Sequence, residues 1–309
     1  ADLDIDGATD IGAAIVDADL FIVDDGAGGT NRKVTASRLK TYAGGGASNI
    51  NGLSDALVES NSLYLGNDPS STTDTAEYNV AVGTTALDAI TTGDKNVSIG
   101  YNSLTASTTA VESVGIGYNA GEDATTGSRN VSLGSYSSQE NVTGSDNVCI
   151  GYNAGQGTSG QNYNNNVYVG GNAGKDVTYG SSNVAIGYDS QSKTDEASNN
   201  TSVGRDSLKN LGVGIHNVCV GYQAGRGATS GTVTPANSVF IGSQAGLLVT
   251  TGNNNVAVGR QSLEELTTGS DNSCLGKGAG QKLETGAYNT CIGKDAGNLL
   301  TTGDNNIVL

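Results

Sequence analysis

The stretch from Asn79 to Lys95 reads NVAVGTTALDAITTGDK, and the next seventeen residues, from Asn96 to Glu112, begin with NVSIG. The unit Asn-Val-x-Ile/Val-Gly recurs with starts at positions 62, 79, 96, 113, 130, 147, 166, 183, 200, 217, 238, 255, 272, 289 and 306. Of the fourteen steps between these starts, twelve are 17 residues long and the other two are 19 and 21. A fixed period of this kind predicts a solenoid in which each copy forms one coil.

Each copy carries apolar residues two apart, which predicts a short strand with one apolar face. Seventeen residues are too few for a pair of helices, so we expect an all-β parallel β-solenoid, or β-roll, with two short strands and two turns per coil. The small residues at the third position of the unit lie on the opposite face and are expected to abut neighbouring chains. The side chains expected to form the structural core are Val80, Val82, Val97, Ile99, Val148, Ile150, Val256 and Val258.

The first position of the unit is Asn in most copies. Coils stacked one strand spacing apart, ~4.8 Å, align equivalent residues along the rod. Stacked Asn side chains can hydrogen-bond to one another, so this column is expected to have a structural role. The expected Asn ladder comprises Asn79, Asn96, Asn130, Asn147, Asn183 and Asn255. The Gly after each strand and the TTG segments are expected to form the turns.

Composition and charge narrow the classes of protein. The 309 residues include 47 Gly, no Trp and no Met, and only 36% are hydrophobic, so the core must be thin. Thin rods favour packing of three chains into a homotrimeric fibre. The net charge of −16 disfavours nucleic acid as a partner. Because no run of ~18 apolar residues occurs and the first residues do not resemble a signal peptide, we expect no membrane insertion.

Residues suited to catalysis or metal binding are sparse. His216 is the only histidine and has no clustered nucleophile, while the acidic pair Glu264 and Glu265 lacks the long loops that a glycosidase cleft needs. The cysteines share the third position with Ala, Ser and Gly and are expected to be free, buried, small side chains; they are Cys149, Cys219, Cys274 and Cys291. We therefore expect no enzyme activity, no metal and no cofactor.

A Tyr/cation column follows the Gly that ends each strand. It is defined by Tyr101, Tyr118, Tyr152, Tyr188 and Tyr222, with Arg205, Arg260, Lys277 and Lys294 in other copies. Packing between coils or chains is the first interpretation of this column, and contact with a host-surface glycan is the alternative.

Residues 1–44 lack the repeat. An apolar run at 20–23, a Gly-rich turn, a return strand at 31–34 and a short amphipathic stretch predict a hairpin-plus-helix module. We expect residues 1–44 to be an attachment module, 45–61 a linker or transition, and 62–309 the solenoid shaft. The residues expected to make the attachment are Leu20, Phe21, Ile22, Val23, Arg32 and Lys33.

Two parts of the sequence resemble known families. The NVAVG and NVAIG strands resemble the β-roll of trimeric autotransporter adhesin heads, and strings such as GYNAG at 117–121 resemble the repeat arrays of bacteriophage tail fibres. The segment Asp17–Tyr42, DADLFIVDDGAGGTNRKVTASRLKTY, resembles a short module found near the N-termini of phage fibre and other virion proteins.

These resemblances imply a structural fibre or appendage component of a phage virion, assembled in the host cytoplasm. The N-terminal module would bind other virion proteins, and the shaft would project for contact with the host surface. The alternative is a trimeric adhesin passenger at a bacterial cell surface, and a polysaccharide-degrading tailspike ranks third.

Overall fold

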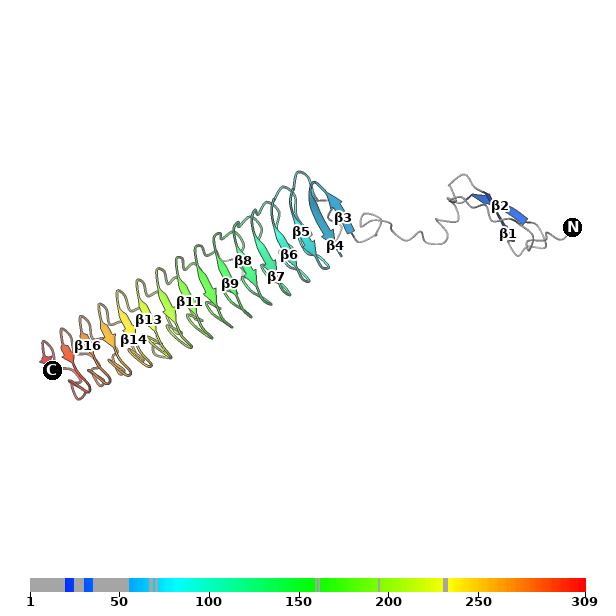
Figure 1. The fold of residues 1–309 in the computed structure, drawn as a ribbon. Coiled ribbons are helices and arrows are strands. Elements are labelled where there is room, and N and C mark those ends of the chain that lie inside the picture. Colours follow the sequence, from blue (N-terminus) through cyan, green and yellow to red (C-terminus); the bar gives the residue numbers. More distant parts are fainter. Residues whose placement is uncertain are drawn as a thin grey trace. The chain divides into compact units, whose positions relative to one another are not determined.

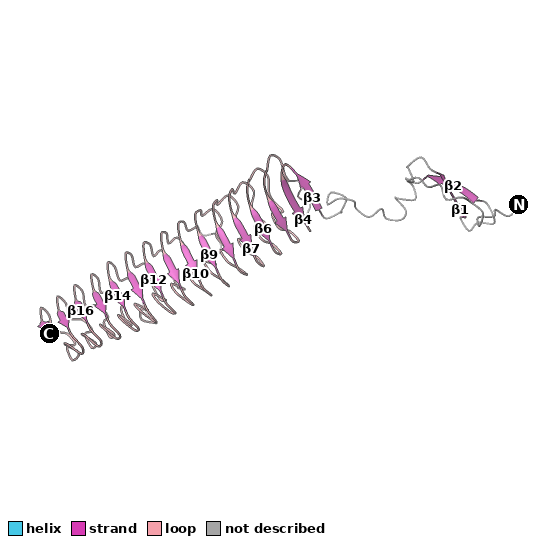
Figure 2. Cartoon of the chain, viewed as in Figure 1, coloured by secondary structure: helices cyan, strands magenta, loops and turns pink. Residues whose placement is uncertain are grey.

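The computed structural model describes residues 20–24, 31–35, 56–66, 69, 72–158, 160, 162–193, 195–229 and 233–309. The chain divides into two units, Ala1–Leu53 and Ser54–Leu309, and each is considered by itself. Every regular element in the described residues is a strand (Figure 2).

The N-terminal unit contains a hairpin of β1 (Leu20–Asp24) and β2 (Asn31–Thr35). The two strands pair antiparallel, with Phe21 opposite Val34 and Ile22 opposite Lys33. The predicted hairpin is therefore confirmed. The helix predicted after it falls on residues 36–42, which lie outside the described residues.

The second unit is a solenoid shaft with one sixteen-stranded sheet (Figure 1). It begins with β3 (Ala56–Glu59), which pairs antiparallel with β4 (Ser62–Leu65). The segment 45–61, expected to be a linker, thus ends in a strand of the shaft. The sheet continues in chain order through β5 (Val80–Val82), β6 (Val97–Ile99), β7 (Val114–Ile116), β8 (Val131–Leu133), β9 (Val148–Ile150), β10 (Val167–Val169), β11 (Val184–Ile186), β12 (Thr201–Val203), β13 (Val218–Val220), β14 (Val239–Ile241), β15 (Val256–Val258), β16 (Ser273–Leu275), β17 (Thr290–Ile292) and β18 (Ile307–Val308).

From β4 onward all the strands are parallel and in register, so the predicted parallel β-solenoid is confirmed. The two longer repeats keep this register. Val148 pairs with Val167 across the 19-residue step, and Val218 pairs with Val239 across the 21-residue step. The extra residues therefore do not shift the equivalent positions of the following coils.

Each coil has one three-residue strand, not the two that the sequence predicted. The side away from the sheet is still held by backbone hydrogen bonds between coils, for example from Leu104 N to Ala120 O at 3.0 Å and from Ala106 N to Glu122 O at 3.1 Å. This side is not extended because residues there adopt left-handed backbone angles, with φ of 52° at Asn102 and 47° at Leu104.

The Gly that ends each strand is required by the stacking of the coils. Gly170 has φ +130°, and a Cβ there would lie 2.7 Å from the carbonyl oxygen of Gly187 in the next coil. Gly187 meets Gly204 in the same way. Only Gly combines this backbone angle with so close an approach of two backbones. The turn predicted at this position is thus also a close contact between coils.

The predicted core residues face the wrong way. Val82 is 37% exposed and Ile99 is 39% exposed, whereas Ala81 and Ser98, the middle residues of the same strands, are fully buried. The prediction of Val80, Val82, Val97, Ile99, Val148, Ile150, Val256 and Val258 as the core within the chain is therefore wrong. The coil is so narrow that its interior admits one side chain per strand, and the paired Val and Ile residues point outward.

The third and ninth positions of each coil share the interior volume between them. Where the ninth residue is Leu, as at Leu263, the third is small, as at Ala257. Where the ninth is Gly, the third is larger, except at Gly115, whose space Leu104 of the preceding coil occupies. A Cβ on Gly246 would lie 2.6 Å from Phe240 Cε1, and one on Gly225 would lie 2.5 Å from Cys219 Sγ. This complementarity fills the shaft without the large residues that the composition lacks.

Adjacent glycines in one turn provide a stability test. Gly170→Ala places a Cβ against the next coil at a Gly-only φ and should lower the free energy of unfolding by about 2–5 kcal/mol. Gly171→Ala is the control, since its Cβ would meet only the exposed Tyr188 ring, at 3.2 Å. The measurement is chemical denaturation followed by far-ultraviolet circular dichroism. Equal losses in the two variants would contradict the role assigned to Gly170.

Candidate interaction surfaces of the shaft

The predicted Asn ladder is present and buried. Asn96 donates from Nδ2 to Asn79 Oδ1 at 3.1 Å and to the carbonyl of Ala110 in its own coil at 2.7 Å. Asn147 contacts Asn130 in the same way, at 3.0 Å, and Asn183 donates to Asn166. Each ladder side chain thus closes its own coil and joins it to a neighbouring one. Where Ser replaces Asn, as at Ser238, the hydroxyl accepts from the backbone of Asn255 at 3.2 Å.

A second polar ladder was not anticipated from the sequence. Short polar side chains just before the αL corner of many coils accept from the backbone N–H of the coil before. Ser128 N donates to Ser145 Oγ at 3.0 Å, and Ala236 N donates to Asn253 Oδ1 at 2.8 Å. The recurrence of Ser, Asn and Asp at this position is its signal in the sequence. Both ladders are structural and leave few free polar groups for a ligand.

The second and fourth residues of the repeat unit form an aliphatic strip on the outer face of the sheet. The fourth residue is Val, Ile or Leu in all fifteen copies, and none of the thirty positions carries a charge. Ile186, Val220 and Ile241 are each nearly two-fifths exposed. Strands run side by side along the whole shaft, so the strip is continuous (Figure 1). A continuous exposed apolar surface of this length is typical of an interaction site.

The Tyr/cation column lies just beyond the aliphatic strip, after the Gly bend. Tyr101 and Tyr118 are stacked with ring centroids 5.5 Å apart, and Tyr118 meets Tyr136 edge-on at 5.3 Å. Tyr136 meets Tyr152 edge-on at 6.0 Å. Packing between coils is therefore confirmed for Tyr101, Tyr118 and Tyr152, with Tyr136, one residue beyond the column position of its coil, completing the row. Tyr118 also has a raised pKa because the neighbouring Tyr136 disfavours its ionised form.

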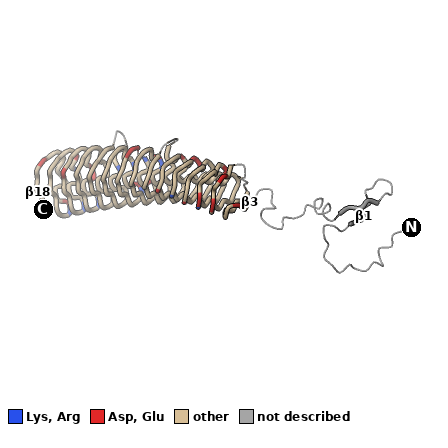
Figure 3. The backbone as a smooth tube through the Cα atoms, turned by 90° about the horizontal axis from the view of Figure 1, so that it is seen from above, with Lys and Arg blue, Asp and Glu red and all other residues tan. Residues whose placement is uncertain are grey.

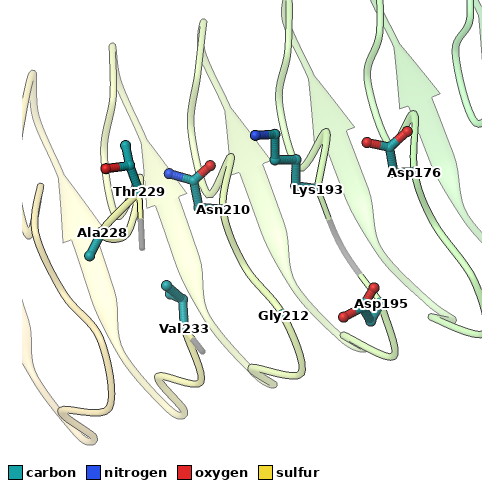
Figure 4. A pocket seen from close by; sticks show the side chains of 8 residues that line it. All are labelled: Asp176, Lys193, Asp195, Asn210, Gly212, Ala228, Thr229 and Val233. Atoms are coloured by element: carbon teal, nitrogen blue, oxygen red, sulfur yellow. The ribbon is translucent and has the colours of Figure 1, made fainter. Parts of the chain in front are cut away.

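A polar hollow of about 380 Å³ opens on the turn side of the shaft. Figure 4 shows Asp176 and Lys193 along one side of it and Asp195 and Val233 along the other. The remaining lining residues are Asn210, Gly212, Ala228 and Thr229. No histidine or cysteine is among the described residues that line the hollow.

The groups that sequence analysis considered for chemistry lie apart. The four cysteines are free and buried at the third position, as predicted. Burial raises the pKa of Cys149 to about 12, despite contacts from Tyr163 and Ser138. His216 is exposed at the corner that precedes β13, with φ 58°. Within the described part of the chain, no three His, Cys, Asp or Glu residues gather as a metal site would require.

The expected attachment residues lie in the N-terminal hairpin. Leu20, Phe21, Ile22 and Val23 belong to β1, and Arg32 and Lys33 belong to β2, where Val23 pairs with Arg32. Figure 3 shows where the charged residues lie along the shaft, with acidic residues frequent near β3.

Comparison with protein-family models, curated protein sequences and solved structures finds no match for this chain. Within the described residues, no helix has the length and apolar character that crossing a membrane requires.

Burial of the thiols gives a chemical test. At pH 8 the native protein should react with a thiol-specific reagent at none of its four cysteines, and all four should react after unfolding. Buried thiols stay protonated where unfolded ones, with a pKa near 9.0, ionise. Their contribution to stability is thus complete below pH 9 and falls as the pH rises. Rapid labelling of Cys219 in the native state would contradict its place inside the coil.

Proposed function

We propose that the chain is a structural component of a virion fibre or appendage and that it works as a homotrimer of parallel chains. The observation that carries this proposal is the uncharged aliphatic strip that runs along the whole outer face of the sheet. A rod with such a strip needs partners that run along its length. Further copies of the same chain supply a matching strip at every coil.

The area of the strip suits a stable interface. Val, Ile and Leu occupy twenty-seven of its thirty positions. About half of these side chains are 36% exposed or more and the others are less exposed. Since a fully exposed side chain of this kind presents on the order of 100 Å² of apolar surface, the strip presents roughly 600–1,000 Å² per chain. Each partner in a standard stable interface contributes ~800 Å². Sequence analysis expected the small third-position residues to abut neighbouring chains. Because those residues are buried inside the coil, the proposed interface is the aliphatic strip instead.

The construction of the shaft supports a mechanical role. Backbone hydrogen bonds, the Asn ladder and the Gly contacts all join adjacent coils, so they resist both bending and slippage of the register. The surface repeats from coil to coil, which suits a spacer that holds two parts of an assembly apart. A repeated surface is a poor place for a unique docking contact, and this favours the separate N-terminal unit as the attachment to the particle.

The virion assignment rests on the resemblance of residues 17–42 to N-terminal modules of phage fibre proteins. In this proposal the hairpin of β1 and β2 contacts other virion proteins. The shaft projects away from the particle toward the host surface, and a glycan there is a candidate partner.

The trimer can be tested by placing charges on the strip. The triple variant Ile99→Asp, Leu133→Asp and Ile186→Asp puts three carboxylates on outward positions in separate coils and should dissociate the assembly while preserving the β-sheet dichroism. Light scattering should give three times the 30.9 kDa chain mass for the unmodified protein and one chain mass for the variant.

The control carries the same three charges on the opposite, turn side of the shaft, at Thr92→Asp, Thr126→Asp and Tyr179→Asp. These positions are exposed in the single chain, so the control should remain trimeric. A monomeric unmodified protein, or equal dissociation of both variants, would contradict association through the strip.

Attachment can be tested by deleting residues 1–44. The truncated chain should keep the β-rich shaft, because β3 and β4 begin after the deletion, and should keep its trimeric mass. It should no longer co-sediment with particles that lack the fibre. Retained co-sedimentation would place the attachment in the shaft and overturn the polarity proposed for the fibre.

A further inference from the structure

We propose that the Tyr/cation column is a binding surface for a linear anionic polysaccharide, held along the shaft by phenol and cationic side chains. This inference rests on the proposed function in one respect, that the shaft is exposed to a surface bearing glycans. It adds the residues and the chemistry of the partner.

The composition of the column sets it apart from the rest of the chain. The thirteen residues that follow a strand-ending Gly, from Thr84 to Lys294, include five Tyr and four Arg or Lys. None of the thirteen is Asp or Glu, although the chain has 31 acidic and 15 basic residues. One edge of an acidic rod is therefore aromatic toward β4 and cationic toward β18.

Arg205 pairs with Asp206 at 3.3 Å, but the other three cations of the column are poorly neutralised. Arg260, Lys277 and Lys294 follow β15, β16 and β17, so they occupy equivalent positions in three consecutive coils. Among the described residues, Arg260 and Lys277 form no ion pair, and Lys294 reaches Asp295 only at 3.6 Å with its own side chain 72% exposed. Like charges stacked on adjacent strands repel one another. An anionic ligand that bridges the three coils would relieve this repulsion.

The arrangement of the tyrosines favours a polyhydroxylated ligand. Tyr101 and Tyr152 are 49% and 57% exposed, yet Tyr101 stacks on Tyr118 and Tyr152 meets Tyr136 edge-on. Arg205 lies over the ring of Tyr188, at 5.9 Å from its centroid. A ligand therefore meets rings that are partly covered by neighbours, together with ring edges and phenol hydroxyls. Sugar hydroxyls and C–H groups can use both, whereas nucleic-acid bases need open ring faces for stacking.

A further copy of the chain is a poorer occupant. In a parallel assembly related by symmetry, the cationic part of one column would face the cationic part of its neighbour. The aliphatic strip, separated from the column by the Gly bend, already offers an uncharged face for self-association. Repeating anions on a polymer match the column instead, because carboxylate, sulfate and phosphate groups are the acceptors that Arg and Lys bind best.

The inference is tested with the full chain and four immobilised probes: polygalacturonate, heparin, neutral dextran and duplex DNA. Binding by biolayer interferometry should be strongest for one of the two anionic glycans, weaker for dextran and DNA, and reduced by salt. The cation variant Arg260→Ser with Lys277→Ser and the aromatic variant Tyr118→Ser with Tyr152→Ser should each weaken glycan binding about tenfold or more.

Matched control variants replace two cations or two tyrosines that lie outside the Tyr/cation column. They are Lys95→Ser with Lys193→Ser, and Tyr179→Ser with Tyr288→Ser, all at exposed positions outside the column. Controls that lose as much binding as the column variants would overturn the inference. So would column variants that bind like the unmodified protein, absence of binding to both anionic glycans, or equal binding to DNA.

Light scattering on the same samples separates this inference from the proposed trimer. A monomer that binds glycan through the column would contradict the trimer and support the polysaccharide surface. A trimer that binds neither anionic glycan would support the assembly and overturn the surface. Circular dichroism of each variant shows that a loss of binding is not a loss of fold.

Discussion

The spacing between coils is the constraint on which the rest of the shaft depends. Because successive strands pair in register, every residue lies against its own equivalent in the next coil. A side chain that recurs at one position of the repeat therefore forms a row along the shaft. Gly170 must be Gly because Gly187 lies against it, and Asn96 is satisfied because Asn79 precedes it. For the same reason, outward aliphatic residues at one position form a continuous apolar strip, and cations at one position form a row of like charges that repel one another.

The interior follows from this spacing in a different way. A coil cannot move away from its neighbours to admit a larger side chain, so volume is exchanged within the coil. Phe240 is accommodated because Gly246 and Gly225 lie against its ring, and Leu263 is accommodated because Ala257 is small. The buried cysteines fit the same rule, since each is matched with Gly at the ninth position. Their thiols act as filling groups, and their raised pKa values are a consequence of that burial.

The sequence was sufficient to predict the period, the parallel stacking, the turns and the Asn ladder, because each is a repeated local pattern. The sequence-based prediction of which strand face is internal was wrong. Alternation separates two faces but does not say which is inside, and Val82 and Ile99 were assigned inward because they are more apolar than Ala81 and Ser98. The deciding signal was Cys219, a residue type most often buried, on the opposite face and paired in volume with Gly225. The single strand per coil was missed because φ 52° at Asn102 has no Gly to mark it.

Repetition also determines what kind of recognition the shaft can support. A solenoid of equivalent coils does not readily build one deep pocket, and the hollow near Asp195 remains open and polar. It can instead present a weak contact many times at a fixed spacing. A linear polymer that binds one coil holds its next unit near the following coil, so each further contact forms at a high effective concentration. Tyr118 and Lys277 need not bind tightly alone for such a surface to hold a polymer. Affinity should then depend on how many consecutive coils keep the column, which makes the stacked coils themselves the functional unit.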